Sequence, residues 1–131
     1  MNDNEYTGIV VGKESTNGEY VVTDGIIGPG GFVPEHYHKY EDQTFHILAG
    51  ELQVKIGAAG ERMTCTVGDS IHCPRGVSHY MKNTGSTDAK VISYIIPGYW
   101  AEDFMAETSR QNQSGEVDLD LIEKQFGVVY V

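Results

Sequence analysis

The sequence predicts an all-β protein, a barrel or sandwich of short strands. Its aliphatic residues include 13 valines and 10 isoleucines but only 4 leucines, a bias typical of strands and not of helix bundles. Short β-branched or aromatic segments recur at regular spacing, with turn-forming residues between them. The 131 residues, 40% of them hydrophobic, are enough to bury a core as one domain.

Eight segments carry the strand pattern. In chain order they are residues 6–11, 20–27, 43–49, 52–56, 63–67, 70–73, 79–82 and 90–96. Gly50 and Glu51 suit a tight turn whose first residue needs a positive φ, and residues 57–60 can close the next reversal. We therefore expect consecutive hairpins in this part of the chain.

After Pro97 the pattern changes from strand to helix. Trp100, Phe104 and Thr108 lie at helical offsets, and Asp118 can cap a second helix that would end at Gly127. The polar residues 109–115 are expected to form a linker or surface loop. We expect a single domain over residues 1–131, with a barrel core at about 6–96 and a helical extension at about 98–131.

The charge balance excludes several kinds of partner. Nine Lys and Arg against nineteen Asp and Glu give a net charge of −10, which repels nucleic acid and anionic membranes. The N-terminal residues contain neither a basic nor an apolar stretch, and the two cysteines lack the close spacing of metal or redox motifs. We therefore expect a reduced, cytoplasmic protein.

The five histidines all fall between His36 and His79. On a strand, His36 and His38 point to the same face and present two imidazoles side by side, as a metal ion requires. A single histidine is more often structural than a ligand, and His-x-His alone is a weak motif. By strand alternation His46 faces away from this pair, and His72 is expected to be a hydrogen-bonded structural residue.

Two longer motifs surround these histidines. The first consists of Gly30, His36, His38, Gln43 and Gly50, and the second of Gly68, Pro74, Gly76, His79 and Asn83. Their spacing resembles the cupin superfamily motifs G-x5-H-x-H-x3/4-E-x6-G and G-x5-P-x-G-x2-H-x3-N, with Gln43 in place of the acidic residue. The resemblance covers residues 30–83 and extends with the flanking strands to about residue 96. It implies a jelly-roll barrel, or double-stranded β-helix, with short C-terminal helices.

The resemblance also implies a metal centre. The ligands of one divalent ion would be His36, His38, Gln43 and His79. Zn, Fe, Mn, Ni and Co all suit such a mixed nitrogen and oxygen site. Because glutamine is neutral, the ion keeps its full charge, which favours polarisation of a substrate oxygen over the chemistry of quercetinase-like dioxygenases. Glu41 or Asp42 could replace Gln43 only through a register shift that the other motif positions do not support.

Strand alternation from Gln43 and His79 identifies candidate walls of a substrate pocket. The candidates, with two aromatic residues from later segments, are Phe45, Ile47, Met81, Tyr94 and Phe104. For the first three, plain core filling is an equally good interpretation, because the interior of a small barrel is mostly core. Arg75 is expected to be solvated or paired with an Asp, and Asn83 to hold a turn.

Two resemblances within the superfamily point to different substrates. The set of three histidines and one glutamine is similar to small uronate-linearising enzymes, whereas residues 97–105 resemble quercetinase-like and polyketide-cyclase-like cupins. The expected function is metal-dependent cyclisation, isomerisation or ring opening of a small, oxygen-rich organic substrate. The alternatives are a metal-dependent dioxygenase and a non-catalytic metal- or ligand-binding cupin. Small cupins usually pair or exchange edge strands, so a homodimer is expected.

Overall fold

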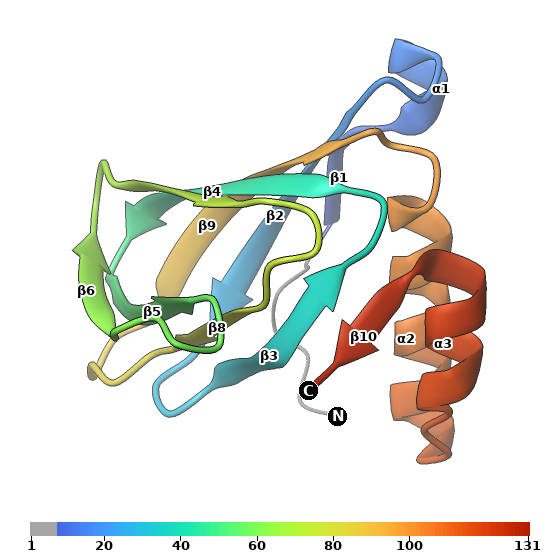
Figure 1. Ribbon diagram of the computed structural model, residues 1–131. Coiled ribbons are helices and arrows are strands. Elements are labelled where there is room, and N and C mark those ends of the chain that lie inside the picture. Colours follow the sequence, from blue (N-terminus) through green and yellow to red (C-terminus); the bar gives the residue numbers. More distant parts are fainter. Residues whose placement is uncertain (1–7) are drawn as a thin grey trace.

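The computed structural model describes residues 8–131 and contains two antiparallel sheets of five strands each (Figure 1). The first sheet contains, in spatial order, β1 (Gly8–Val11), β2 (Val21–Ile27), β9 (Ala89–Ile96), β4 (Asp42–Ala49) and β7 (Ser70–Cys73). The second contains β10 (Val128–Tyr130), β3 (Phe32–His38), β8 (His79–Lys82), β5 (Glu51–Ile56) and β6 (Met63–Thr66). The all-β prediction is confirmed, although residues 6 and 7 of the first expected strand lie outside the described residues.

The hydrophobic core lies between the two sheets, because alternate residues of each strand point inward. On β9, for example, Val91 and Ile95 are buried while Lys90 and Ile96 are exposed. The largest cluster of buried hydrophobic residues draws on both sheets: Ile27, Val33, Phe45, Ile47, Leu52, Val54, Cys65, Ile71, Cys73, Met81, Ala89 and Val91. Both cysteines are therefore small buried core residues.

The turn at Gly50 carries the chain from one sheet to the other. β4 pairs with β7 and β9, whereas β5 pairs with β6 and β8. The predicted hairpin between residues 43–49 and 52–56 is therefore wrong, although Gly50 has the expected positive φ, 76°. A tight turn needs the same backbone conformation whether the strands on its two sides pair with each other or belong to different sheets. The turn residues alone therefore do not reveal which strands pair. The next hairpin, between β5 and β6, is confirmed.

Two helices follow the strands. The second of them, α3 (Leu119–Phe126), begins as predicted: the Asp118 side chain accepts a hydrogen bond of 3.0 Å from the amide of Leu121. It ends at Gly127, which has a φ of 69°. Local capping chemistry therefore identified this helix correctly. A short helix, α1 (Lys13–Thr16), between β1 and β2 was not predicted.

Residues 109–115 were expected to form a linker or loop, but the helix α2 (Ala101–Ser114) continues through all of them except Gly115, so the expectation is wrong for residues 109–114. The reason lies in Gln111, which is fully buried despite being polar. Its side-chain oxygen accepts a hydrogen bond of 2.8 Å from the amide of Asp118, which links the end of α2 to the start of α3. A buried polar link of this kind has no signature in hydrophobic periodicity.

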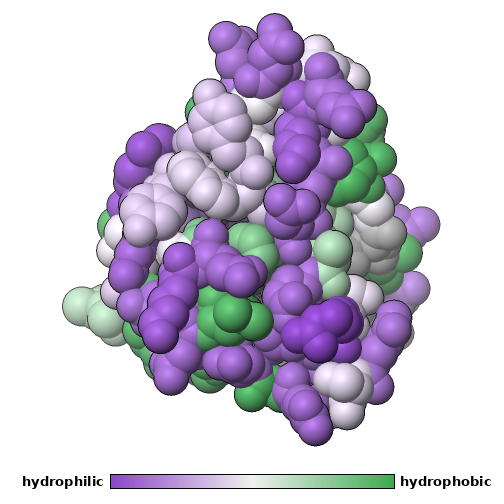
Figure 2. Space-filling model, turned by 90° about the vertical axis from the view of Figure 1, so that its right-hand side faces the viewer, coloured by the Kyte–Doolittle hydropathy of each residue, from purple (hydrophilic) through white to green (hydrophobic). Residues whose placement is uncertain are grey.

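The strand β10 returns the chain to β3, so that Val128 lies opposite His38 and Tyr130 opposite His36. A second cluster joins this strand to the helices; its buried members are Phe104, Ile122, Phe126 and Val128, with Trp100, Met105 and Tyr130 packed against it. Figure 1 shows α2, α3 and β10 together at one end of the sheets. The face shown in Figure 2 is mostly hydrophilic, with hydrophobic residues in small groups. No described helix is long and apolar enough to span a membrane.

Candidate metal centre

Three histidines from β3 and β8 converge in the interior. His36 and His38 occupy alternate positions of β3, and His79, the first residue of β8, lies opposite His36 in the antiparallel register. The ring centroids of His36 and His79 are 4.3 Å apart, and those of His38 and His79 are 5.6 Å apart. Each ring offers a nitrogen within 4.8 Å of those of the other two, and all three side chains are buried. This is a group that could hold a metal ion.

The turn before β8 fixes the position of His79. Gly76, with a φ of 79°, donates from its amide to the carbonyl oxygen of His38 at 2.7 Å. Arg75 donates to the carboxylate of Asp42 from both its backbone amide (2.9 Å) and its guanidinium (3.0 Å). The turn is thereby tied to the end of β3 and to the start of β4, and the prediction that Arg75 pairs with an Asp is confirmed.

In two of the three rings, those of His36 and His38, a hydrogen bond to Nδ1 selects which nitrogen faces the neighbouring histidines. Nδ1 of His36 donates to the carbonyl of Pro34 at 2.7 Å, and Nδ1 of His38 lies 3.1 Å from Oε1 of Glu41. A proton on Nδ1 leaves the lone pair on Nε2. The Nε2 atoms of His38 and His79 are buried and have no hydrogen-bond partner among residues 8–131. Buried polar atoms without a partner cost free energy, so this donor set fits a metal ion.

Burial keeps the imidazoles of His36 and His79 neutral. Loss of solvation, together with the nearby His38, lowers the pKa of His36 to about 3. Loss of solvation, together with His36 and His38, lowers the pKa of His79 well below its usual value. Neutral imidazole is the form that binds metal, so these two rings are in the binding form near neutral pH.

Gln43, the fourth predicted ligand, points into the same interior from β4 and is 1% exposed. Its Nε2 donates a hydrogen bond of 2.8 Å to the hydroxyl of Ser93, which is also buried. Because the amide nitrogen is used in this way, the carbonyl oxygen is the atom with which Gln43 would bind an ion. Its place in the ligand set stays a prediction.

Two of the predicted pocket residues lie against the histidines. The ring of Phe45 is 5.8 Å from that of His79, and the ring of Phe104 is 6.4 Å from that of His38, both edge to face. Both aromatic side chains are buried. Their role as pocket walls stays a prediction that the geometry permits.

The other three predicted pocket residues are Ile47, Met81 and Tyr94. Ile47 and Met81, like Phe45, belong to the hydrophobic cluster between the sheets, in agreement with the core-filling interpretation. Tyr94 is 43% exposed, so the prediction that it lines the pocket is wrong. Its neighbours Ser93 and Ile95 are buried, and strand alternation therefore turns Tyr94 to the outer face of β9.

The sequence analysis missed the roles of two residues beside the histidines. Glu41 was considered only as a replacement ligand, but the structure buries it against His38. Tyr130 was not considered, and its ring lies 5.4 Å from that of His36. The β-branched and aromatic run at residues 128–131 is a strand signal that could have identified it. No local signal identified the role of Glu41.

The remaining two histidines are outside the centre, as expected. His46 and His72 lie on the partly exposed outer face of β4 and β7. Nδ1 of His46 is 2.9 Å from the hydroxyl of Ser70, and Nδ1 of His72 is 3.0 Å from the hydroxyl of Thr44. Both make structural hydrogen bonds between the two strands.

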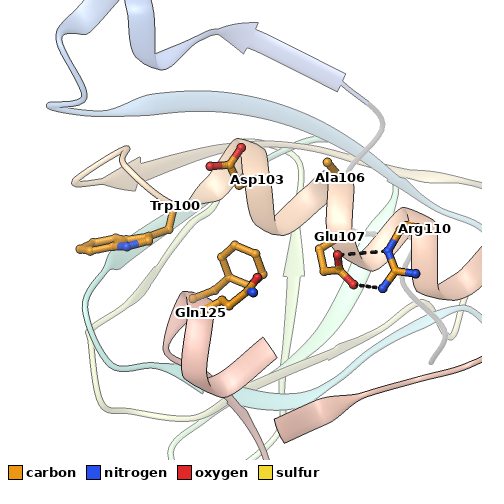
Figure 3. Close-up of a pocket in the computed structure, with 7 residues that line it drawn as sticks. Trp100, Asp103, Ala106, Glu107, Arg110 and Gln125 are labelled. Atoms are coloured by element: carbon orange, nitrogen blue, oxygen red, sulfur yellow. Dashed lines mark hydrogen bonds and ion pairs between the residues drawn. The ribbon is translucent and has the colours of Figure 1, made fainter. Parts of the chain in front are cut away.

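A groove of about 490 Å³ lies between α2 and α3 (Figure 3). It is lined by Trp100, Asp103, Ala106, Glu107, Arg110, Gln125 and Phe126. Within it the carboxylate of Glu107 accepts hydrogen bonds from the guanidinium of Arg110. None of the lining residues belongs to the histidine group, so the groove is a feature of the helical extension.

Comparison with known proteins identifies the family of the region that contains the two motifs. A family model described as a cupin domain matches residues 23–95, more than half of the chain. The chain is 28% identical over 90 residues to quercetin 2,3-dioxygenase of Bacillus subtilis (strain 168), covering 69% of this chain and 26% of that protein. It is 31% identical over 80 residues to tetracenomycin polyketide synthase protein TcmJ of Streptomyces glaucescens, covering 57% of this chain and 52% of that protein. The chain thus spans about a quarter to a half of these relatives.

Solved structures share the architecture. A conserved protein with a double-stranded β-helix domain from Klebsiella pneumoniae superimposes with a TM-score of 0.64 at 21% identity, covering 76% of this chain and 82% of that one. A protein from Thermotoga maritima described as a predicted oxalate decarboxylase superimposes with a TM-score of 0.64 at 27% identity, covering 69% of this chain and 77% of that one. With the family model matched across both motifs and the two-sheet fold shared, the chain belongs to the cupin family.

Proposed function

We propose that this cupin is a metal-dependent enzyme that acts on a small, oxygen-rich organic substrate. The observation that carries the proposal is the convergence of three buried imidazoles, two of them with lowered pKa values, from β3 and β8. The ion would be held by His36, His38, His79 and the side-chain oxygen of Gln43. When bound, it would polarise a substrate oxygen and stabilise negative charge that develops there.

The proposed ligands are all neutral side chains. Imidazoles with their lone pairs on a metal, and the amide of Gln43, do not take a proton from a substrate near neutral pH. The ligands therefore hold the ion without reducing its charge, and they do not act as bases. This favours reactions in which polarisation of a carbonyl or enol oxygen is the main requirement, such as cyclisation, isomerisation or ring opening.

Aromatic rings from three parts of the chain would form the walls of the substrate site. Phe45 contributes from β4, Phe104 from α2 and Tyr130 from β10, each with its ring against one of the three histidines. Such walls suit a flat, unsaturated molecule. Phe104 and Tyr130 lie outside residues 23–95, so the part of the site from the C-terminal extension is where this chain would differ from other cupins in its choice of substrate.

A metal-dependent dioxygenase is the second candidate. It is favoured by the match to quercetin 2,3-dioxygenase over 69% of the chain. The neutral Gln43 counts against it, because the acidic ligand at this position is thought to serve as the base in quercetinase-like cupins. The two candidates differ in their use of oxygen, which can be measured directly.

Elemental analysis of the protein without a polyhistidine tag tests the proposal. We expect nearly one divalent ion per chain in the parent, and loss of that ion in His38→Ala and His79→Ala. The matched control is His46→Ala, which removes an imidazole from the outer face and should keep the ion. Zinc would support polarisation chemistry, whereas iron, manganese or nickel together with oxygen consumption would favour the dioxygenase.

Two results would contradict the proposal. Protein that takes up none of these ions, even after reconstitution with several of them, would have no metal centre. Protein that binds the ion but converts none of a panel of enolic, polyketide-like and uronate substrates would be better described as a metal-binding cupin without catalysis.

A further inference from the structure

The carboxylate of Glu41 is buried beside the histidine group. The residue lies just before β4, three positions after His38, and is 3% exposed. Its Oε1 is 3.1 Å from Nδ1 of His38, on the opposite edge of the ring from Nε2. Its Oε2 is also buried and has no hydrogen-bond partner among residues 8–131. Burying a carboxylate with an unsatisfied oxygen costs free energy.

The cations around Glu41 are paired with other carboxylates: Lys39 with Glu123 and Arg75 with Asp42. The guanidinium of Arg75 donates to the carboxylate of Asp42 through two nitrogens, at 3.0 and 3.3 Å, and its backbone amide donates to the same group. No ion pair joins Glu41 to a Lys or Arg in the described chain, although Glu41 is one of the acidic groups, after Asp42, that raise the pKa of Arg75. The side chain at hydrogen-bond distance from the Glu41 carboxylate is the ring of His38.

Glu41 does not occupy the position of a ligand. The group of convergent donor atoms contains one nitrogen from each of three histidines and no carboxylate oxygen. Glu41 instead contacts the Nδ1 atom of the His38 ring. In metal sites generally, a carboxylate in this position fixes the ring orientation and the tautomer and increases the basicity of the ligand nitrogen.

We propose that Glu41 is the positioning residue of the metal centre: it accepts a hydrogen bond from Nδ1 of His38, directs Nε2 of that ring to the ion, and places next to the centre the negative charge that Gln43 does not carry. The inference rests on the proposed function. In this cupin the residue at the acidic position of the motif, Gln43, is then a neutral oxygen donor. The carboxylate charge comes from Glu41 and acts on the ion by way of the His38 ring.

Zinc affinity of the purified chain, measured by competition with a chromogenic chelator, tests the inference. We expect Glu41→Ala to weaken Zn²⁺ binding by roughly 10- to 100-fold, the usual effect of losing such a partner. Glu41→Gln keeps the size of the side chain and an oxygen that can accept a hydrogen bond from Nδ1, so it should lose only the part of the Zn²⁺ affinity that depends on the negative charge. The matched control is Glu35→Gln, a carboxylate beside His36 that instead contacts Ser78 and Lys55 and should change the affinity less than about threefold.

A second measurement separates positioning from a merely structural role. In ¹⁵N-edited spectra of the metal-free protein, His38 of the parent should show the tautomer protonated at Nδ1, and Glu41→Ala should lose that preference while the fold is retained. Glu41→Ala that binds Zn²⁺ as tightly as the parent, with the tautomer unchanged, would overturn the inference and leave the proposed function intact. A parent chain that binds no divalent ion would overturn both.

Discussion

The ring of His36 lies 4.3 Å from the ring of His79 because the two residues are opposite each other in the register of β3 and β8. Each comes from a different motif, so the centre exists only when the two strands pair in this register. A slip of one residue would turn His79 to the outer face of the sheet. The turn at Gly76, which is bonded to the carbonyl of His38, is therefore as necessary to the centre as the histidines.

Metal should stabilise the fold, and only when the histidine group is intact. Zn²⁺ at about 100 times its dissociation constant should raise the free energy of unfolding by about 2.7 kcal/mol. Thermal unfolding with and without Zn²⁺ measures this. His79→Ala should show no increase, whereas His72→Ala, on the outer face, should respond like the parent. Equal increases in both variants would place the bound zinc elsewhere.

Gly50→Ala should destabilise the fold more than Gly30→Ala. Both glycines have a positive φ, 76° and 77°, so alanine is strained at either position by about 1–2 kcal/mol. At Gly50 the added Cβ would also lie 2.7 Å from the backbone oxygen of Asp88, whereas at Gly30 it would meet nothing within 4 Å. Urea unfolding should give the lower midpoint for Gly50→Ala. Equal midpoints would mean that the turn between β4 and β5 adjusts to the added Cβ without loss of stability.

Asn83→Ala should cost about 2–3 kcal/mol, because it leaves buried backbone groups without partners. The side chain is fully buried, donates to the carbonyls of Ile27 and Thr87 at 2.8 Å each, and accepts from the amide of Gly85 at 2.9 Å. Denaturant unfolding measures the loss. Ser86→Ala, an exposed change in the same loop, should cost less than about 0.5 kcal/mol. A similar cost for both variants would argue against the proposed role of Asn83.

The pair of Glu35 and Ser78 should make stability depend on pH. The Ser78 hydroxyl donates to Glu35 at 2.8 Å, and Lys55 approaches the other oxygen at 3.3 Å. The Ser78 hydrogen bond is the main cause that lowers the pKa of Glu35 from its usual 4.5. Because the folded pKa lies below the unfolded one, this contribution is present above pH 4.5 and is lost as the pH falls through the folded value.

Ser78→Ala tests this dependence. The difference in free energy of unfolding between parent and variant should be largest near pH 7 and should shrink as the solution is acidified below pH 4.5. Urea titrations at a series of pH values measure it. A difference that stays constant with pH would mean that Ser78 contributes through packing and not through the carboxylate.

The C-terminal cluster should protect β10, and through it the edge of β3. Ile122→Ala removes a fully buried side chain of α3 and should cost about 2–5 kcal/mol. Leu119→Ala, on the same helix but 46% exposed, is the control and should cost far less. Amide hydrogen exchange at residues 128–130 should speed up in Ile122→Ala only. Unchanged exchange would show that β10 pairs with β3 without support from the helices.

Much of the fold was predictable because its signals are local. The segments 70–73 and 79–82 match β7 and β8 residue for residue. Asp118 and Gly127 marked the ends of α3, since capping depends on residues within one turn. Starting from Gln43 as an inward residue, which the cupin resemblance implies, strand alternation correctly placed Phe45 and Ile47 inside and His46 outside. No such starting residue was known for β9, and Tyr94, proposed for the pocket, lies on the outer face.

The sequence by itself determined the all-β class, the two motifs with their histidines, and the backbone conformations at Gly50 and Gly76. Only the tertiary structure decided that Gly50 crosses between sheets, that Glu41 is buried against His38, and that Tyr130 lies against His36. Turns and caps depend on residues close together in the chain, and each leaves a pattern there. Strand pairing and burial depend on contacts between residues far apart in the chain. The free energy of such a contact depends on both residues, so neither segment by itself contains a pattern that predicts it.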